Sequence, residues 1–336
     1  MEDPQPKLNR MPQFVAIGAL LVALLLVLLG SGPMGDLLLR GSRTSKALAT
    51  LGVVTKTPTS SGPQASGTPS AQPTATRTPP ATPRPREDHY LLRRPIAPPY
   101  EQHVALFYLY GSRGGGAYPI HHGVEFVNPL GTPVLAAADG EVVFAGEDVT
   151  RVVGARSGFY GQAIIVEHPS LWHGQPVYTV YGHVAEVHVT EGDQVRAGQV
   201  IGLVGEEGSA EGPHLHFEVR YGENAYTATV NPELWVEPIQ GRGTLAAWLG
   251  SRDGTPAPES HVVIYRADRP NVPVRELLTY PDSKVNPDPS WGENLVVGDL
   301  PAGDWILRTY AAGVYYEEPF TVHPGATTFL ALTTSS

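Results

Sequence analysis

The chain has 336 residues, which is enough for two domains of ordinary size, with a formal net charge of −10 and no cysteine. The acidic balance and the lack of a basic stripe argue against nucleic acid as a partner. The absence of cysteine excludes disulfides, cysteine zinc ligands and cysteine nucleophiles. Nine of the twelve histidines lie between His103 and His216, so we expect the chemistry there.

An apolar run from Phe14 to Gly30 follows a short tail, residues 1–13, that contains Lys7 and Arg10. The run is at the short end of what crosses a bilayer core of about 30 Å. The alternative is a cleaved signal peptide, but the run is long for one and no clear Ala-x-Ala cleavage site follows. We therefore predict an uncleaved transmembrane signal anchor over 14–30, with residues 1–13 as a cytoplasmic tail. Positive charges flank both sides and do not decide the orientation.

Residues 31–97 are predicted to form a linker rich in Pro, Thr and Ser. Its most biased part, from about Thr55 to Arg86, cannot bury enough apolar surface to offset the entropy of ordering. About forty residues in polyproline II form would reach at most ~120 Å, long enough to cross a cell wall. An incidental disordered linker is the alternative.

The rest of the chain predicts a mainly β fold, because short β-rich runs alternate with Gly, Pro and Asp and helical periodicity is nearly absent. Residues 98–237 are expected to form an antiparallel β-sheet domain, and residues 238–336 a small β-sandwich. The strands expected in the first domain are Val104–Tyr108, Gly123–Val127, Thr132–Ala136, Gly140–Ala145, Gly161–Glu167, Val177–Gly182, Val200–Val204 and His214–Arg220. Those expected in the second are Leu245–Leu249, His261–Arg266, Asn294–Val297, Trp305–Ala311, Tyr315–Val322 and Thr327–Thr333.

The stretch from Gly212 to Arg220 places two histidines on one face of a strand. Side chains alternate along a strand, so His214, His216 and Glu218 share one face while the intervening apolar residues face the core. The two histidines are then about 6 to 7 Å apart along the strand. One can bind a metal while the other reaches what the metal binds.

His121 and Glu125 can complete such a site. On a straight strand they would lie about 13 Å apart, so the chain must turn between them, and Gly123 permits that turn. Two imidazoles and one carboxylate, with the fourth position left to water, form a recurrent catalytic zinc arrangement. The alternative is a surface ion pair between His121 and Glu125. A third strand, starting at Val177, ends in His183.

Seven motifs follow one another along this domain: His121-His122-Gly123-Val124-Glu125-Phe126, Pro129-Leu130-Gly131-Thr132-Pro133-Val134, Ala138-Asp139-Gly140, Tyr181-Gly182-His183, Gly192-Asp193-Gln194-Val195, Gly198-Gln199-Val200-Ile201-Gly202 and Gly212-Pro213-His214-Leu215-His216-Phe217-Glu218. In order and spacing they resemble the lysostaphin-type (LytM-type) zinc metallopeptidases, over roughly Tyr108 to Val236. The resemblance implies a zinc endopeptidase that cuts peptidoglycan stem or cross-bridge peptides. It implies that His121, position 125 and His216 bind Zn²⁺, and that His183 and His214 are catalytic. One of these two would act as general base and the other would stabilise the oxyanion, in an order that the sequence leaves open. Glu218, on the same strand face, could orient a ligand imidazole.

Two departures from the family pattern affect these expectations. The family usually has Asp where this chain has Glu125, which places the carboxylate on one more methylene and raises the alternative of weak zinc binding. In that case the chain would be a non-catalytic wall-binding or regulatory protein that activates a partner hydrolase. Secondly, the loop before Gly212 carries Glu206, Glu207 and Glu211. We favour a solvated acidic loop over one that selects cationic wall peptides.

The remaining expectations concern the C-terminal block and the location of the protein. Residues 300–313 resemble carboxypeptidase-regulatory-like or other transthyretin-like β-sandwiches over a short match. The resemblance of the peptidase domain implies that both C-terminal domains lie outside the cytoplasm, in the periplasm or cell wall. Peptidoglycan peptides and the membrane are the expected partners, together with partner wall hydrolases or division proteins.

Overall fold

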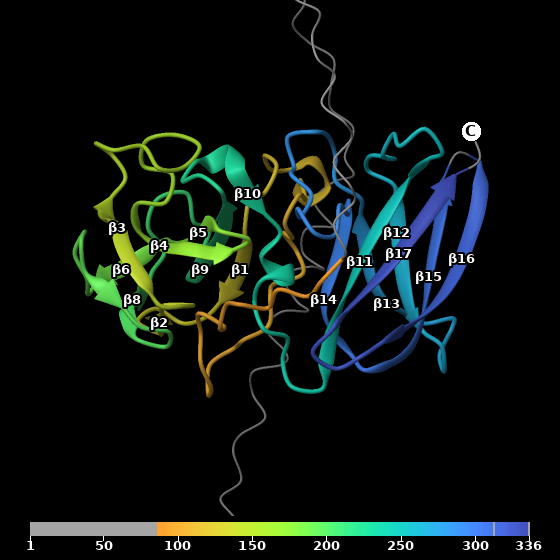
Figure 1. Ribbon diagram of the computed structural model, residues 1–336, viewed down its shortest axis with the longest axis horizontal. Coiled ribbons are helices and arrows are strands. Elements are labelled where there is room, and N and C mark those ends of the chain that lie inside the picture. The colour runs from red at the N-terminus through yellow and green to blue at the C-terminus, as the bar shows by residue number, and fades with distance from the viewer. Residues whose placement is uncertain (1–85, 312, 335–336) are drawn as a thin grey trace, which may run out of the picture. The chain divides into compact units, whose positions relative to one another are not determined.

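The computed structural model describes residues 86–311 and 313–334, a region built mainly of β-strands joined by turns (Figure 1). The predicted tail at 1–13, the apolar run at 14–30 and the predicted linker up to residue 85 lie outside the described residues. Among the residues that are described, no helix is long and apolar enough to cross a bilayer. The described helical segments are short 3-10 turns: η1 Gly114–Gly116, η2 Tyr226–Ala228 and η3 Pro232–Leu234.

The first half of this region contains two antiparallel sheets. A seven-stranded sheet has the order β1-β9-β5-β4-β3-β7, with β10 also paired to β9, and a smaller sheet has the order β2-β8-β6. The strands are β1 Val124–Val127, β2 Pro133–Leu135, β3 Gly140–Glu147, β4 Gln162–Trp172, β5 Gln175–Gly182, β6 Val184–Val187, β7 Gln194–Val195, β8 Val200–Val204, β9 His214–Tyr221 and β10 Thr229–Val230. The antiparallel β domain expected from the sequence is confirmed.

Strand β9 lies in the interior of the large sheet, between β1 and β5, and its alternating sequence explains its two faces. Leu215, Phe217 and Val219 are fully buried in the main hydrophobic core. Each fully buried side chain of this size contributes ~1.5 to 3 kcal/mol relative to exposure. His216 and Glu218, on the other face, are also buried. Buried polar side chains need partners, and the partners are described with the site below.

The C-terminal half contains two further sheets, of orders β14-β11-β17 and β13-β12-β15-β16, which share a hydrophobic core that includes Trp305 and Leu307. The pairing of β11 with β17 is parallel, and the other pairings in these sheets are antiparallel. The strands are β11 Arg242–Ser251, β12 His261–Arg266, β13 Pro273–Leu278, β14 Leu295–Pro301, β15 Gly303–Ala311, β16 Val314–Val322 and β17 Thr327–Thr334.

Two segments outside the strands pack into the main hydrophobic core. The first is residues 86–97, which the sequence assigned to the linker. Leu92 and Ile96 are fully buried in the main core, and the amide of Leu92 donates to the carbonyl of Trp235 at 3.0 Å. This end of the predicted linker therefore packs as part of the fold. The second segment connects β13 to β14, and its Tyr280 and Trp291 are buried in the same core.

Most expected strands are present, but the strand expected at Val104–Tyr108 was a wrong prediction. Val104 is buried, whereas Leu106 and Phe107 are 54% and 68% exposed, and the segment has turns in place of a strand ladder. A single backbone hydrogen bond, from the amide of Ala105 to the carbonyl of Glu125, ties this segment to β1. Its β-forming residues therefore have no strand ladder to join. The short strands β6, β7 and β10, and β13, were not predicted.

Candidate metal centre and active site

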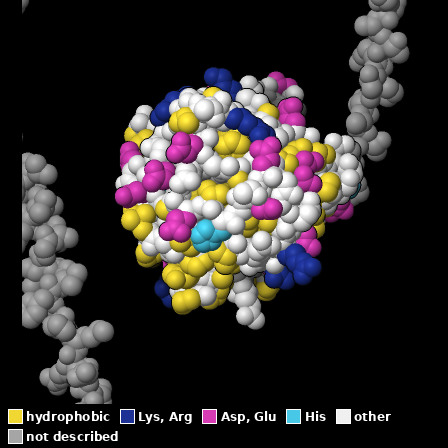
Figure 2. Space-filling view, turned by 90° about the vertical axis from the view of Figure 1, so that its left-hand side faces the viewer, with side chains coloured by type: hydrophobic (Ala, Val, Ile, Leu, Met, Phe, Trp, Pro, Cys, Tyr) yellow, Lys and Arg dark blue, Asp and Glu magenta, His cyan; other side chains and the backbone are white. Residues whose placement is uncertain are grey.

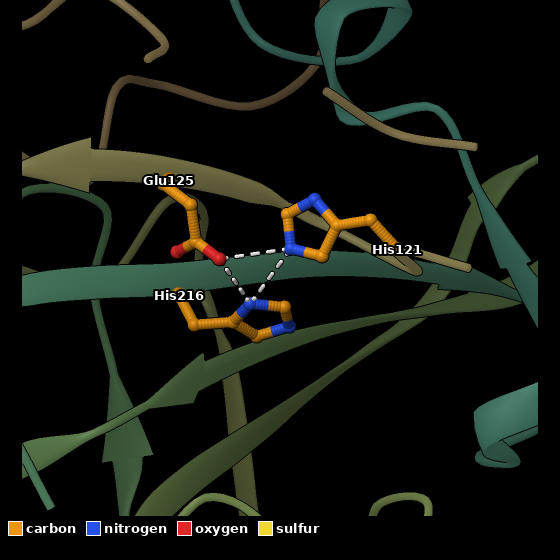
Figure 3. A group of neighbouring side chains, drawn as sticks. All are labelled: His121, Glu125 and His216. Carbon is orange, nitrogen blue, oxygen red and sulfur yellow. Dashed lines mark hydrogen bonds and ion pairs between the residues drawn. The ribbon is translucent and has the colours of Figure 1, made fainter. Parts of the chain in front are cut away.

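Three side chains converge between β1 and β9. Glu125 on β1 lies opposite His216 on β9 in the strand register, and His121 lies three residues before β1 (Figure 3). Oε1 of Glu125 lies 2.8 Å from Nε2 of His121 and 3.1 Å from Nδ1 of His216, and the two nitrogens are 3.3 Å apart. All three side chains are buried, and together they form a group of metal-ligand type. The structure thus brings together the three residues expected to bind the metal.

A bend at Gly123 makes this convergence possible, but for a different reason from the one expected. Gly123 does not adopt a positive φ, so conformational freedom is not what the position uses. A Cβ at Gly123 would instead lie 2.6 Å from the carbonyl oxygen of Phe217 and 2.8 Å from Nε2 of His216. Glycine is therefore needed because the imidazole of His216 packs directly against the backbone of the bend.

The donor set fits a zinc ion. Ligand atoms at ~2.0 to 2.1 Å around a tetrahedral zinc lie ~3.3 Å from one another. The three distances here are 2.8, 3.1 and 3.3 Å. The second carboxylate oxygen, Oε2 of Glu125, is buried without a hydrogen bond of good geometry, although Nε2 of His214 lies 3.1 Å away. Two imidazoles and a carboxylate with a spare oxygen therefore suit zinc.

The electrostatics of the site also favour a cation. Burial alone would raise the pKa of Glu125, but charge on His216 and His121 outweighs it and holds that pKa well below its usual range. Burial would lower the pKa of His216, but Glu125 and Glu218 overcome this and raise it to about 10. Two buried carboxylates next to one imidazole therefore stabilise positive charge at this point.

Glu218 supports His216 from the side away from Glu125. Nε2 of His216 donates to Oε1 of Glu218 at 3.1 Å, and the hydroxyl of Tyr160 donates to the same oxygen. Nε of Arg220 donates to Oε2 at 2.9 Å. Burial would raise the pKa of Glu218, but Arg220 and His216 hold it at about 2, so the carboxylate is ionised. This carboxylate fixes the ring of His216 with Nδ1 turned to Glu125.

His183, the first of the two residues expected to be catalytic, follows β5 directly with a φ of +61°. This left-handed conformation is uncommon for a residue with a side chain. Nδ1 lies 2.6 Å from the carbonyl oxygen of Glu207, and since a carbonyl can only accept, Nδ1 carries the proton. Burial, with charge on His216 and His214, lowers the pKa of His183 to about 4. The ring is therefore neutral near pH 7, with Nε2 free to accept a proton.

His214, the second of these residues, is partly buried at the start of β9. Its ring lies 4.8 Å from that of His183, centroid to centroid, in an edge-to-face arrangement. Nδ1 lies 2.8 Å from the carbonyl oxygen of Gly212, and Nε2 lies 3.1 Å from Oε2 of Glu125. Since a carbonyl can only accept, Nδ1 carries a proton, and Nε2 faces the carboxylate of Glu125.

Sequence reasoning missed two aromatic residues at the site. Tyr160, fully buried just before β4, supports Glu218, and its carbonyl oxygen accepts from the amide of His183 at 3.1 Å. The ring of Tyr108 stacks on that of His121 with 3.9 Å between centroids and 10° between planes. The available signal for Tyr160 was an aromatic residue directly before the glycine that begins an expected strand, Gly161–Glu167. Tyr108 had been placed in a strand that is absent.

The acidic loop is exposed, as the favoured interpretation expected, but its backbone contributes to the site. Glu206, Glu207 and Glu211 are exposed, and Glu211 accepts a hydrogen bond from the hydroxyl of Tyr118 at 2.8 Å. The carbonyl of Glu207 fixes His183, as described above. Figure 2 shows acidic side chains interspersed with apolar ones on one face of the molecule, with Lys and Arg side chains scattered between them.

Comparison with known proteins gives a consistent assignment. The sequence model of peptidase family M23 matches residues 119–232. The DD-carboxypeptidase/endopeptidase Mpg of Neisseria meningitidis is 41% identical over 101 residues, which are 30% of this chain and 20% of that protein. Lysostaphin of Staphylococcus staphylolyticus is 37% identical over 111 residues, which are 31% of this chain and 21% of that protein. The chain thus spans about a fifth of the length of these curated relatives.

Among solved structures, the catalytic domain of lysostaphin from Staphylococcus simulans is 31% identical, with a TM-score of 0.31 over 39% of this chain and 86% of that one. The region that the model of peptidase family M23 matches, residues 119–232, contains all three candidate metal ligands as well as His183 and His214. The family resemblance inferred from the motifs is confirmed, and the chain carries a domain of peptidase family M23.

Proposed function

We propose that this chain is a zinc-dependent endopeptidase that hydrolyses peptide bonds in peptidoglycan stem or cross-bridge peptides. The observation that carries the proposal is the buried convergence of His121, Glu125 and His216, with two further histidines beside it. The names of relatives support the substrate class. ShyA of Vibrio cholerae, 36% identical over 99 residues that are 30% of this chain and 20% of that protein, is named a peptidoglycan DD-endopeptidase.

His121, Glu125 and His216 would hold the zinc ion. When bound, zinc lowers the pKa of a water molecule towards ~7 and polarises the scissile carbonyl. Glu218 and Tyr160 keep His216 in the orientation that presents Nδ1 to the other two ligands. The extra methylene of Glu125 does not prevent convergence, since its Oε1 lies 2.8 and 3.1 Å from the two nitrogens.

The two remaining histidines divide the proton transfers. His183 is neutral, with Nδ1 donating to the carbonyl of Glu207, so its Nε2 can take the proton of the attacking water as general base. Nε2 of His214 lies on the same side of the site, 3.1 Å from Oε2 of Glu125. From there, when its Nε2 carries a proton, His214 would stabilise negative charge on the carbonyl oxygen of the substrate.

The location of the enzyme is also a proposal. The apolar run at 14–30 and the Pro, Thr and Ser-rich segment after it support a single-pass anchor with the peptidase outside the cytoplasm. Such a tether would let the domain reach wall peptides away from the membrane. Protease accessibility of the C-terminal domains in intact cells, with a cytoplasmic control protein, tests this placement.

Cleavage of purified peptidoglycan tests the function. We expect the full-length chain to release new peptide amines, chelator to abolish this release, and added Zn²⁺ to restore it. His216→Ala should be inactive with or without zinc. A wild type that binds zinc but cleaves no wall peptide would contradict the enzyme assignment and favour the alternative, a protein that activates a partner wall hydrolase or division protein.

A further inference from the structure

The connection between β13 and β14, residues 279–294 and hereafter the bridging loop, belongs to the C-terminal half by sequence but packs on the peptidase half. Tyr280, Val285 and Trp291 are buried in the same hydrophobic core as Phe217 of β9. Asp288 anchors the loop, because its Oδ2 accepts hydrogen bonds from Nε1 of Trp235 at 2.9 Å and from Nε2 of His89 at 2.8 Å. The bridging loop is therefore held firmly against the domain that carries the site.

One route from the bridging loop to the metal site passes through Gly111. A Cβ at Gly111 would lie 2.6 Å from Cδ1 of Tyr280 and 3.2 Å from Cγ1 of Val285, and its φ is +76°, so this position requires glycine. The amide of Gly111 donates to the carbonyl of His121 at 2.8 Å, and the amide of His121 donates to the carbonyl of Ser112 at 3.0 Å. The backbone of a metal ligand is thus bonded to a segment that the loop presses against.

A second route passes through the side chain of Asn286. Its Nδ2 donates to the carbonyls of Thr227 at 2.7 Å and Thr229 at 2.9 Å. The hydroxyl of Tyr110 lies 2.8 Å from the carbonyl oxygen of Thr229 and 3.2 Å from that of Asn286. Oγ1 of Thr229 in turn bonds Nδ1 of His122, the neighbour of His121, at 2.8 Å. Both routes therefore end at the His121-His122 pair.

We propose that the bridging loop positions His121 for zinc binding, with Asn286 and Tyr280 as positioning residues. The C-terminal half contributes none of the three ligands, yet its docking orders the backbone of one of them. Zinc binding and docking of the loop are consequently coupled, and disturbing either weakens the other. This inference rests on the proposed function in so far as it assigns His121 to zinc.

Zinc affinity, measured by competition with a chromophoric chelator on the full-length chain, tests the coupling. Groups that orient metal ligands typically change affinity 10- to 100-fold when removed. We expect Asn286→Ala to bind zinc about tenfold more weakly than wild type. Asn286→Asp keeps the shape of the side chain but has no donor, so it should bind zinc no better than Asn286→Ala. The milder Tyr110→Phe should lose about threefold, the equivalent of one hydrogen bond. Lys284→Ala, an exposed position in the same loop, is the matched control and should bind as wild type.

A second measurement does not depend on zinc. In the metal-free protein, the amides of Gly111 and His121 should exchange with solvent about tenfold faster in Asn286→Ala than in Lys284→Ala, as expected for weakened local protection. The inference is overturned if Asn286→Ala binds zinc within twofold of wild type and its amide exchange is unchanged. If Asn286→Ala does not fold, the same result in Tyr110→Phe overturns it. If the wild type binds no zinc but Asn286→Ala still exchanges these amides faster than Lys284→Ala does, the positioning role is supported and the proposed function is contradicted.

Discussion

Shortening the carboxylate ligand by Glu125→Asp should weaken zinc binding, although the family usually has Asp at this position. Glu125 lies directly opposite His216 in the β1-β9 ladder, so its Cα cannot move without disturbing a paired strand. Removing one methylene retracts the carboxylate by ~1.5 Å. Zinc-ligand distances tolerate changes of about 0.2 Å. We therefore expect a loss of ~10- to 100-fold in affinity, equivalent to ~1.4 to 2.8 kcal/mol.

Chelator competition on purified full-length protein measures this loss, and peptidoglycan cleavage at saturating zinc measures what activity remains. Glu223→Asp removes the same methylene at an exposed position, whose side chain makes no hydrogen bond or ion pair among the described residues, and serves as the matched control. Zinc binding by Glu125→Asp that equals or exceeds that of the wild type would refute the reasoning. It would show that the longer carboxylate is a poor ligand and that the site is attenuated in this chain.

Three further predictions concern the residues around the site and the core. His183→Ala should keep its zinc but lose ~10² to 10⁴-fold in kcat, since only a proton acceptor is removed, and zinc loss in this variant would contradict that role. Tyr160→Phe should lower the free energy of unfolding in urea by ~2 kcal/mol, because a buried charged hydrogen bond to Glu218 is lost, and exposed Tyr100→Phe should show no such change. Burial, with the nearby charge of Asp288, raises the pKa of Glu293 to about 8. The contribution of Glu293 to the free energy of unfolding is therefore fully present below pH 4.5 and is lost as pH rises through 8. The free energy of unfolding should fall by ~4 kcal/mol between pH 5 and pH 9. Glu293→Gln should flatten that slope, and an unchanged slope would show that Glu293 is ionised in the fold.

Local sequence pattern was enough to predict the parts of the site that depend on strand periodicity and short spacing. Alternation along β9 separates His216 and Glu218 from Phe217, and the structure has them on opposite faces. The need for a bend between His121 and Glu125 followed from strand rise alone. The physical role of Gly123 did not, because the close approach of His216 depends on the pairing of β1 with β9.

The contacts between the halves could not be predicted, because they depend on tertiary packing between segments far apart in the sequence. Leu92 and Ile96 lie in the last residues of the predicted linker, just after its low-complexity part, yet both are fully buried. Asn286 gives no local signal, since its significance comes from carbonyls more than fifty residues away. The hydroxyl of Tyr160, which lies in a bend before β4, likewise acquires its role only through a bond to Glu218 on β9.

The central claim is that His121, Glu125 and His216 form one zinc site. Its most direct test is the zinc content of the full-length chain after dialysis against trace zinc, measured by mass spectrometry of the metal for wild type and His216→Ala. We predict one zinc per wild-type chain and close to none in the variant. Equal zinc content in the two proteins, or no zinc in the wild type, would contradict the account.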